Sequence, residues 1–507
     1  MLFPTFEFAV FFSLTFLGSW LLRPFPVPWR WFILAASYVF YAWWDWRFCF
    51  LLAASTVGNW AAAEGIARAR TEQARRAVLV AAVAANLVVL GFFKYYGFFA
   101  TSVTDGLETL GIDAHPPLVQ VILPVGISFF TFQALSYVID RYRDDTECSP
   151  LLDFAVYLSF FPHLVAGPIV RARELLPQLQ ERPDPRRVDA ALAFRLIFAG
   201  LFKKVVISSF VASAAVDEVF AVPGKFRSLE ILVAIYAYAI QIYADFSGYT
   251  DIAIGCALLL GLRFPQNFDA PYTARSIQDF WRRWHITLST WLRDYVYIPL
   301  GGNQRGARRT SINLFLTMLL GGLWHGAAWT FVVWGAIHGG AMTVERSLAA
   351  KRRDRELAFA GGWGDEHQRD AAVLVASRPG GSGDGRPEPD RPPPEPFRTQ
   401  VVRWLVTFHV VCLAWVFFRA ETLGDAFELL WRLVSAPGSG PVVKPMLLFV
   451  IVAMIASQFV PSDVVDRVQA RFSLLPFVAQ GAALGVGLLV IDALGPVGVA
   501  PFIYFQF

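Results

Sequence analysis

The chain contains eleven apolar segments that are long enough, or nearly long enough, to cross a lipid bilayer as helices. A bilayer core about 30 Å thick needs about 20 apolar residues per helix. The sequence is 56% hydrophobic and 17% charged, whereas a soluble chain carries about 25% charged residues. We therefore expect an all-α polytopic membrane protein. The expected spans are 6–22, 29–45, 48–66, 77–93, 119–139, 189–212, 228–260, 312–345, 402–419, 444–460 and 474–498, of which 228–260 and 312–345 are long enough to be broken.

Charged residues in the short loops indicate which ends of these segments face the cytoplasm. Cytoplasmic loops are enriched in Lys and Arg, and four arginines lie within 68–76. The loop 100–118 has three acidic residues and no Lys or Arg, so we expect it outside, on the same side as the N-terminus. The apolar run 154–170 lies between two basic clusters that both belong inside. We therefore predict a re-entrant or interfacial segment there, with a helix broken near Gly167 and Pro168.

Residues 277–295 have the spacing of an amphipathic helix. Apolar residues recur every three or four positions, and Asp279 can pair with Arg282 and Arg283 one turn later. We expect this helix to lie in or near the cytoplasmic interface. His285 lies at the border of the apolar stripe. It is either an interfacial histidine or a second polar residue that completes a site inside the membrane.

One histidine lies inside a long apolar run. His325 follows Trp324 within the segment 312–345, and small residues such as Gly322 and Gly326 surround it. Ionisable groups are costly in a bilayer and are kept there when they pair, line a water-filled path or react. An imidazole has an unperturbed pKa of about 6.5, which suits proton transfer near neutral pH. His325 is therefore either a catalytic base or a structural histidine bonded between helices.

Three other polar residues in apolar runs have structural explanations. His338 would lie about 20 Å from His325 if both were on one continuous helix, so we expect it to take part in helix packing. Asp245 and Asp251 interrupt the run 228–260. They indicate a helix break, or else a cavity or a coupling-ion site. A transporter or flippase would use such a site, so that class of function stays open.

Composition and motifs argue against several other classes. The four cysteines are far apart and form no CxxC pair, so we expect no disulfide and no structural metal. The net charge of +4 is too small to indicate a nucleic-acid partner. The hydrophilic segment 351–399 is predicted to be a disordered cytoplasmic loop between a core domain, 1–345, and C-terminal helices, 400–507. In a scaffold protein this loop would be the docking site.

Five motifs resemble those of the membrane-bound O-acyltransferase (MBOAT) family, in the bacterial branch that contains alginate O-acetyltransferases and D-alanyl transfer proteins. The long motif that begins at Asp279 is the most specific of them. The motifs are Leu123–Gln133, Phe160–Ile169, Tyr243–Tyr249, Asp279–Asn303 and Leu323–Gly326. The resemblance implies about 11 spans, plus re-entrant or interfacial helices, around a thin centre. It also implies that His325 is the catalytic histidine at the base of a funnel and that His285 is accessory.

The resemblance further implies an O-acyltransferase in the bacterial inner membrane. The donor would be acetyl-CoA or an acyl-carrier thioester in the cytoplasm, and no bound cofactor or metal is expected. Arg282, Arg283 and Trp324 are candidate donor-binding residues, and His285 would position the donor or help stabilise the oxyanion. The acceptor would be an exported polysaccharide, reached directly or through a periplasmic acetyltransferase. D-alanyl transfer to a cell-envelope polymer is the alternative within the family.

Overall fold

The structure is a computed structural model that describes residues 1–112, 121–181, 184–360 and 396–495. Every regular element in these ranges is helical, which confirms the expected all-α class. The first helices are α1 (Phe6–Leu22), α2 (Pro26–Asp45), α3 (Phe48–Arg68), α4 (Glu72–Leu90), the π-helical turn η1 (Gly91–Tyr95), α5 (Tyr96–Thr109), α6 (Ile127–Tyr142), α7 (Leu151–Ser159), α8 (Phe161–Leu164) and α9 (Ala172–Gln180).

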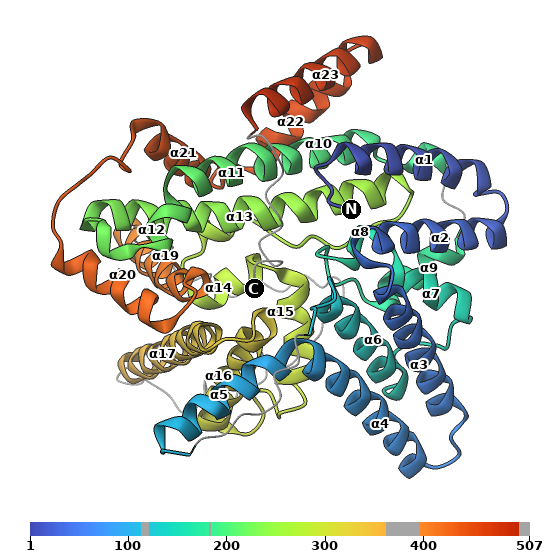
Figure 1. Cartoon of the computed structure of the whole chain (residues 1–507), viewed down its shortest axis with the longest axis horizontal. Coiled ribbons are helices and arrows are strands. Elements are labelled where there is room, and N and C mark those ends of the chain that lie inside the picture. The colour runs from blue at the N-terminus through green and yellow to red at the C-terminus, as the bar shows by residue number, and fades with distance from the viewer. Residues whose placement is uncertain (113–120, 182–183, 361–395, 496–507) are drawn as a thin grey trace.

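The remaining helices surround and complete the centre (Figure 1). They are η2 (Pro185–Arg187), α10 (Ala190–Leu201), η3 (Phe202–Ser208), α11 (Ser209–Val211), η4 (Ala212–Val216), α12 (Asp217–Ala221), η5 (Pro223–Lys225), α13 (Ser228–Leu259), η6 (Pro271–Thr273), α14 (Ile277–Arg283), α15 (Ile286–Leu292), η7 (Arg293–Tyr297), α16 (Gly306–His325), α17 (Trp329–Ala360), α19 (Phe397–Arg419), α20 (Leu423–Ser435), α21 (Pro445–Ser457), α22 (Ser462–Ser473) and α23 (Phe477–Leu494).

Four helical segments in the described ranges are long and apolar enough to cross a membrane: Glu72–Thr109, Ser228–Leu259, Phe397–Arg419 and Phe477–Leu494. Within Glu72–Thr109 and Phe477–Leu494, only 6% of the most apolar window is buried inside the protein. Apolar side chains on such outer helices are therefore available to lipid. Several other expected spans coincide with shorter or more polar helices, so the expected number of eleven spans is not confirmed.

Helix α13 is the buried centre of one half of the protein, with 78% of its most apolar window buried. It is continuous from Ser228 to Leu259, so the break considered near Asp245 and Asp251 is wrong. Each acid has an ion-pair partner from η3 instead: Asp245 pairs with Lys204, and Asp251 lies 2.5 Å from Lys203. The two acids that suggested a coupling-ion site are thus bound to lysines from a neighbouring helix.

The run predicted at 312–345 is a helical hairpin. Helix α16 ends at His325, and α17 begins at Trp329 after a short break. The two helices approach closely because a glycine replaces a side chain at the contact: a Cβ added to Gly322 would lie 2.3 Å from the carbonyl oxygen of Phe331. His325 and His338 are therefore on different helices, and the separation of about 20 Å expected on one continuous helix does not apply.

The expected helix over 277–295 is also broken. Helix α14 ends at Arg283, and His285 has a left-handed backbone with φ of 42° before α15 begins. The segment beginning at Asn267 pairs with this break, because Ile286 N–H donates to the carbonyl oxygen of Asn267 at 2.9 Å. These bonds satisfy backbone groups that the break exposes. His285 is consequently fully buried rather than at a border.

Three other expectations concern the ends of helices and can be compared with the structure. The chain is helical up to Thr109, so much of the expected outer loop 100–118 is helix, and residues 113–120 lie outside the described ranges. Helix α6 begins only at Ile127, because Gly126 has φ of 76°. The segment 154–170 is interrupted as predicted, with α7 ending at Ser159 and the one-turn α8 following.

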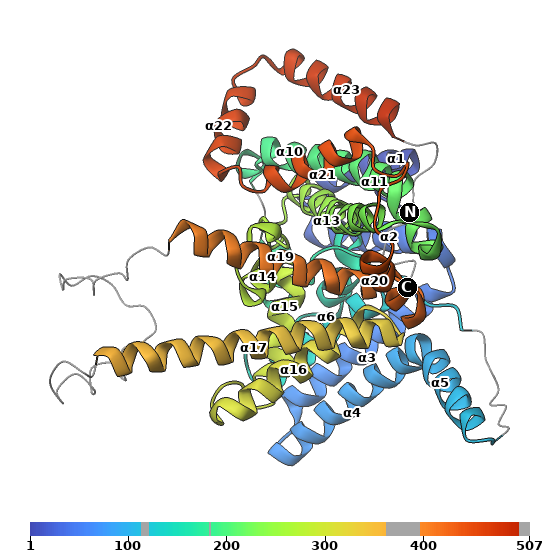
Figure 2. The same cartoon turned by 90° about the vertical axis from the view of Figure 1, so that its left-hand side faces the viewer.

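Helices α17 and α19 run across the molecule side by side. The end of α17 at Ala360 and the start of α19 at Phe397 lie on the same side in Figure 2, whereas α5 projects on the opposite side. The predicted loop 351–399 therefore begins and ends within helices. Its residues 361–395 lie outside the described part of the chain.

Candidate active site

Two histidines that are distant in sequence meet at the centre of the protein. The ring centroids of His285 and His325 are 6.4 Å apart, and both side chains are almost completely buried. His325 is the last residue of α16, and His285 is the residue between α14 and α15. The resemblance implied that these two residues belong to one site, and their positions agree with that expectation.

The aromatic side chains of Phe246, Trp324, Trp334 and Phe418 form a cage around the two imidazoles. Within the cage, His325 lies edge-on to Trp334 at 4.9 Å and has Phe418 at 5.3 Å. On the other side, His285 lies edge-on to Phe246 at 4.6 Å and has the ring of Trp324 at 5.9 Å. These rings exclude water from the imidazoles and restrict their rotation. The site is therefore an apolar enclosure with two nitrogen bases inside it.

The ring of His285 is held by Asn267. Its Nδ1 lies 3.1 Å from Oδ1 of Asn267, which also lies 3.2 Å from the backbone nitrogen and 2.9 Å from the hydroxyl of Thr287. The same hydroxyl accepts a bond from Ile169 N–H at 3.0 Å. The interrupted segment after α8 thus supports the wall of the site through Thr287.

The end of α16 is capped by the π-helical turn η1. The last carbonyl groups of a helix have no partner within the helix. Tyr95 donates its hydroxyl to the carbonyl of Leu323 at 2.7 Å, and the ammonium of Lys94 donates to the carbonyls of Trp324 and of His325, the latter at 3.1 Å. A π-helical turn is frequently found at a functional site. Here it brings two consecutive donors to the backbone of the catalytic candidate.

A cleft of about 860 Å³ lies beside the residues that follow His325. It is lined by the break between α16 and α17, by η1 and by the end of α19. Its polar or charged lining residues are Lys94, Asp217, Thr330, Arg419 and Glu421. The cleft therefore lies at the start of α17 and the end of α19, the ends away from Ala360 and Phe397.

The other predicted site residues occupy different positions. Trp324 is buried beside both histidines. Arg282 is exposed on α14, whereas Arg283 is paired with Asp279 at 3.0 Å and lies 3.6 Å from Asp269. His338 lies behind the cage, where its Nδ1 accepts a hydrogen bond from the indole N–H of Trp281 at 3.3 Å. Only Trp324 of the three candidate donor-binding residues contacts the histidines.

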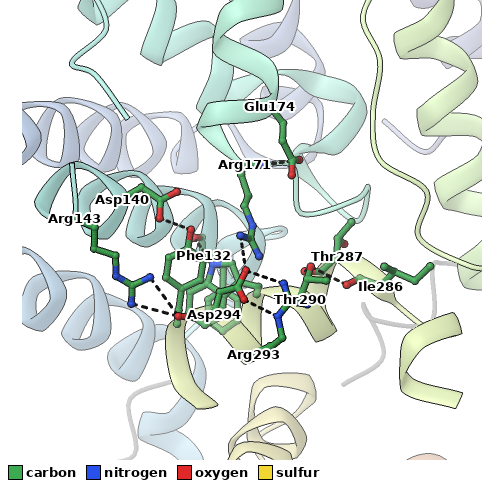
Figure 3. A network of polar contacts seen from close by, with 12 residues as sticks. Phe132, Asp140, Arg143, Arg171, Glu174, Ile286, Thr287, Thr290, Arg293 and Asp294 are labelled. Carbon is green, nitrogen blue, oxygen red and sulfur yellow. Dashed lines mark hydrogen bonds and ion pairs between the residues drawn. The ribbon is translucent and has the colours of Figure 1, made fainter. Parts of the chain in front are cut away.

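A polar network joins η7, the turn that follows α15, to α6 and to the start of α9 (Figure 3). Asp294 pairs with Arg171 at 2.7 Å and with Arg293 at 2.6 Å, while the hydroxyl of Tyr295 donates to Asp140 at 2.6 Å. Burial alone would raise the pKa of the Asp294 carboxyl group, but hydrogen bonds from Arg293 and Arg171 hold it below its ordinary value. The network thus holds the C-terminal end of α15, the helix that follows His285.

Within the described residues, no group of three or more His, Cys, Asp or Glu side chains is arranged to hold a metal ion. Sequence reasoning missed Lys94, Tyr95 and Asn267. Lys94 had a signal, because an ionisable residue directly follows the apolar run 77–93. Asn267 had none, because it lies in a polar loop where an asparagine is ordinary.

Comparisons with known proteins identify the family. The profile of the membrane-bound O-acyltransferase family matches residues 127–361. A probable alginate O-acetylase AlgI from Azotobacter vinelandii is 40% identical over 439 residues, covering 86% of this chain and 78% of that protein.

Relatives with other named acceptors are also similar. A peptidoglycan O-acetyltransferase from Helicobacter pylori is 35% identical over 466 residues, covering 86% of this chain and 80% of that protein. A teichoic acid D-alanyltransferase from Bacillus subtilis is 30% identical over 240 residues, covering only 45% of this chain and 60% of that protein. The O-acetylating relatives are therefore similar over a larger part of the chain.

Proposed function

Because the chain belongs to the membrane-bound O-acyltransferase family, we propose that it moves an acetyl group from a cytoplasmic thioester to a hydroxyl group of an exported polysaccharide. Transfer is either direct or relayed by a periplasmic acetyltransferase. The similarity to O-acetylating relatives over 86% of the chain favours acetate, whereas the D-alanyltransferase is similar over 45%. The meeting of His285 and His325 in an apolar enclosure is the observation that carries the proposal.

In the proposed reaction, His325 is the general base. Its imidazole takes the proton of the acceptor hydroxyl while the oxygen attacks the thioester carbonyl carbon. The carbon–sulfur bond then breaks, and the thiolate leaves with the proton that His325 returns. Lys94 and Tyr95 support this role because they hold the backbone at residues 323–325. The aromatic cage supports it by keeping water, a competing nucleophile, away from the thioester.

The two substrates enter from opposite sides in this proposal. The donor, acetyl-CoA or an acyl-carrier thioester, arrives from the cytoplasm, where exposed Arg282 attracts its phosphates and Trp324 lies next to the acyl group. Arg283 contributes less, because Asp279 and Asp269 already neutralise it. The acceptor enters through the cleft beside Lys94, at the start of α17 and the end of α19. The protein then lies in the bacterial inner membrane with this cleft facing the periplasm.

The test is His325→Ala, compared with His409→Ala, which changes an exposed histidine on α19. Polymer O-acetylation is measured in cells in which the amount of membrane-inserted protein has been matched. Loss of a general base lowers the rate about 10²- to 10⁴-fold, so His325→Ala should abolish detectable acetylation while His409→Ala retains it. Wild-type acetylation by folded His325→Ala protein would refute the proposed role.

A further inference from the structure

The backbone N–H of Thr287 fixes the orientation of the Asn267 side-chain amide, because an N–H can only donate a hydrogen bond. The backbone N–H of Thr287 points to Oδ1 of Asn267, with an N–O distance of 3.2 Å. A backbone N–H donates and never accepts. The Asn267 atom that faces Thr287 is therefore the amide oxygen and not the amide nitrogen, which could otherwise be exchanged without changing the shape of the side chain.

This orientation determines which nitrogen of His285 carries the proton. Nδ1 of His285 lies 3.1 Å from the same oxygen, and a carbonyl oxygen only accepts. Nδ1 must therefore be the donor. In a neutral imidazole the other nitrogen then has a lone pair and no hydrogen. Nε2 of His285 is buried and has no hydrogen-bond partner among the described residues.

A buried acceptor without a partner needs an explanation in a native protein. Two other buried histidines provide a contrast. Nε2 of His163 lies 2.8 Å from the carbonyl oxygen of Tyr157, so it is protonated. Nδ1 of His338 accepts from Trp281, so its proton is also on Nε2. Of these three residues, only His285 presents a bare Nε2, and only His285 has the ring of His325 at 6.4 Å.

We propose that Asn267 is a positioning residue that holds His285 as the Nδ1–H tautomer, so that Nε2 accepts a hydrogen bond from an N–H or O–H group of the bound substrates. The identity of that group rests on the proposed acyl transfer. Two sources share the required chemistry: an amide N–H of a pantetheine thioester and a hydroxyl of the acceptor other than the reacting one, whose proton His325 takes. The tautomer excludes neutral His285 as a hydrogen-bond donor to the oxyanion, because its only N–H is bonded to Asn267.

The tautomer can be read directly from nitrogen-15 chemical shifts of protein labelled at histidine. The chain has seven histidines, and the difference spectrum between wild type and His285→Gln identifies the signals of His285. We expect an Nδ1–H imidazole for His285 and Nε2–H imidazoles for His163 and His338, which serve as references within the same sample. An Nε2–H or doubly protonated ring at His285 in the wild-type protein at neutral pH would overturn the proposal.

Variants of Asn267 test the positioning role. Asn267→Asp keeps an oxygen acceptor for both Nδ1–H and Thr287 N–H, so it should keep the tautomer. Asn267→Leu removes the acceptor, and His285 should lose its preference for Nδ1–H. Asn59→Leu, which removes another buried asparagine that pairs with Asn86 on α4, controls for the general cost of losing a buried amide.

Kinetics then distinguish the two sources of the bound group. Misplacement of a catalytic-site group can cost about 100-fold in rate. If the donor amide is the partner, Asn267→Leu raises KM for the thioester. If the acceptor hydroxyl is the partner, kcat falls at saturating thioester with its KM unchanged. Equal kinetic constants for Asn267→Leu and wild type overturn the proposal. A wild-type protein with no acyl-transfer activity refutes the proposed function instead, and the tautomer measurement still stands.

Discussion

His285 and His325 lie with ring centroids 6.4 Å apart, although His285 precedes α15 and His325 ends α16, on either side of the η7 turn. This separation is too large for direct stacking, yet a small polar group between the rings can approach both. In the proposed reaction both imidazoles contact the bound substrates, so their contributions to the rate should depend on each other.

Single and double substitutions measure this dependence. His285→Ala and His325→Ala should each lower kcat, but the double variant should be little worse than His325→Ala alone, because residues that act as a unit are not additive. The measurement is acetyl transfer from labelled acetyl donor to polymer in membrane vesicles. Multiplicative losses in the double variant would show instead that the two residues act independently.

The cap of α16 predicts a difference between two neighbouring residues. Lys94→Met removes an ammonium that bonds to Trp324, His325 and Ser128, whereas Tyr95→Phe removes one neutral hydrogen bond. Hydrogen bonds to charged groups contribute roughly 1.5–3 kcal/mol and neutral ones roughly 0.5–1.5 kcal/mol. Lys94→Met should therefore lower thermal stability in detergent and kcat more than Tyr95→Phe. A larger loss of stability and kcat in Tyr95→Phe than in Lys94→Met would contradict the role of Lys94 as the main cap of α16.

The contact between α16 and α17 predicts a steric effect at one glycine. A Cβ at Gly322 would lie 2.3 Å from the backbone oxygen of Phe331, whereas a Cβ at Gly340 meets nothing within 4 Å. Overpacking typically costs 1–3 kcal/mol. Gly322→Ala should thus lower the midpoint of thermal unfolding and reduce activity. Gly340→Ala, on the same hairpin, should leave both unchanged or slightly raise stability.

The exposed arginine on α14 predicts an effect on the donor. Arg282→Glu should raise KM for the acetyl donor, with a larger effect at low salt, because exposed charges are screened as ionic strength rises. Arg471→Glu, which reverses an exposed charge on α22, should have a much smaller effect. The measurement is the initial rate against donor concentration at two salt concentrations. An unchanged KM in Arg282→Glu would remove Arg282 from the donor site.

The Asp294 network predicts a pH-dependent stability. Since the pKa of Asp294 is depressed in the folded protein, its contribution is present above the unfolded carboxyl pKa of about 3.9 and is lost as pH falls through the folded value. Asp294→Asn should be less stable than wild type at pH 7, and the difference should shrink below about pH 4. Thermal unfolding of both proteins across this range is the measurement; a constant difference would exclude the ion pairs as its cause.

Part of this fold could be predicted because a helix that contacts lipid needs a long run of apolar residues, which is visible in the sequence. The expected span 6–22 coincides with α1, which begins after a Thr5 cap, and 402–419 and 444–460 lie close to α19 and α21. The family resemblance of the motifs at 279–303 and 323–326 predicted that His285 and His325 belong to one site. Apolar length and motif identity need no knowledge of tertiary contacts.

The remaining features depend on contacts between distant segments. The break at His285 has no adjacent glycine or proline, and it is set by backbone pairing with Asn267 and its neighbours. The role of Lys94 depends on a π-helical turn that aims it at α16. Neither hydrophobic period nor residue type reveals such pairings, so the positioning residues of the site could not be predicted.

The left-handed backbone of His285 also bears on how the centre of the protein is held together. This conformation costs a residue with a Cβ roughly 1–2 kcal/mol, and His285 adopts it with φ of 42°. Glycine at the same position would relieve the strain and remove the imidazole. Because that imidazole is fully buried and bonded to Asn267, glycine would exchange the backbone strain for a cavity, so the strained conformation is held by the packing around it.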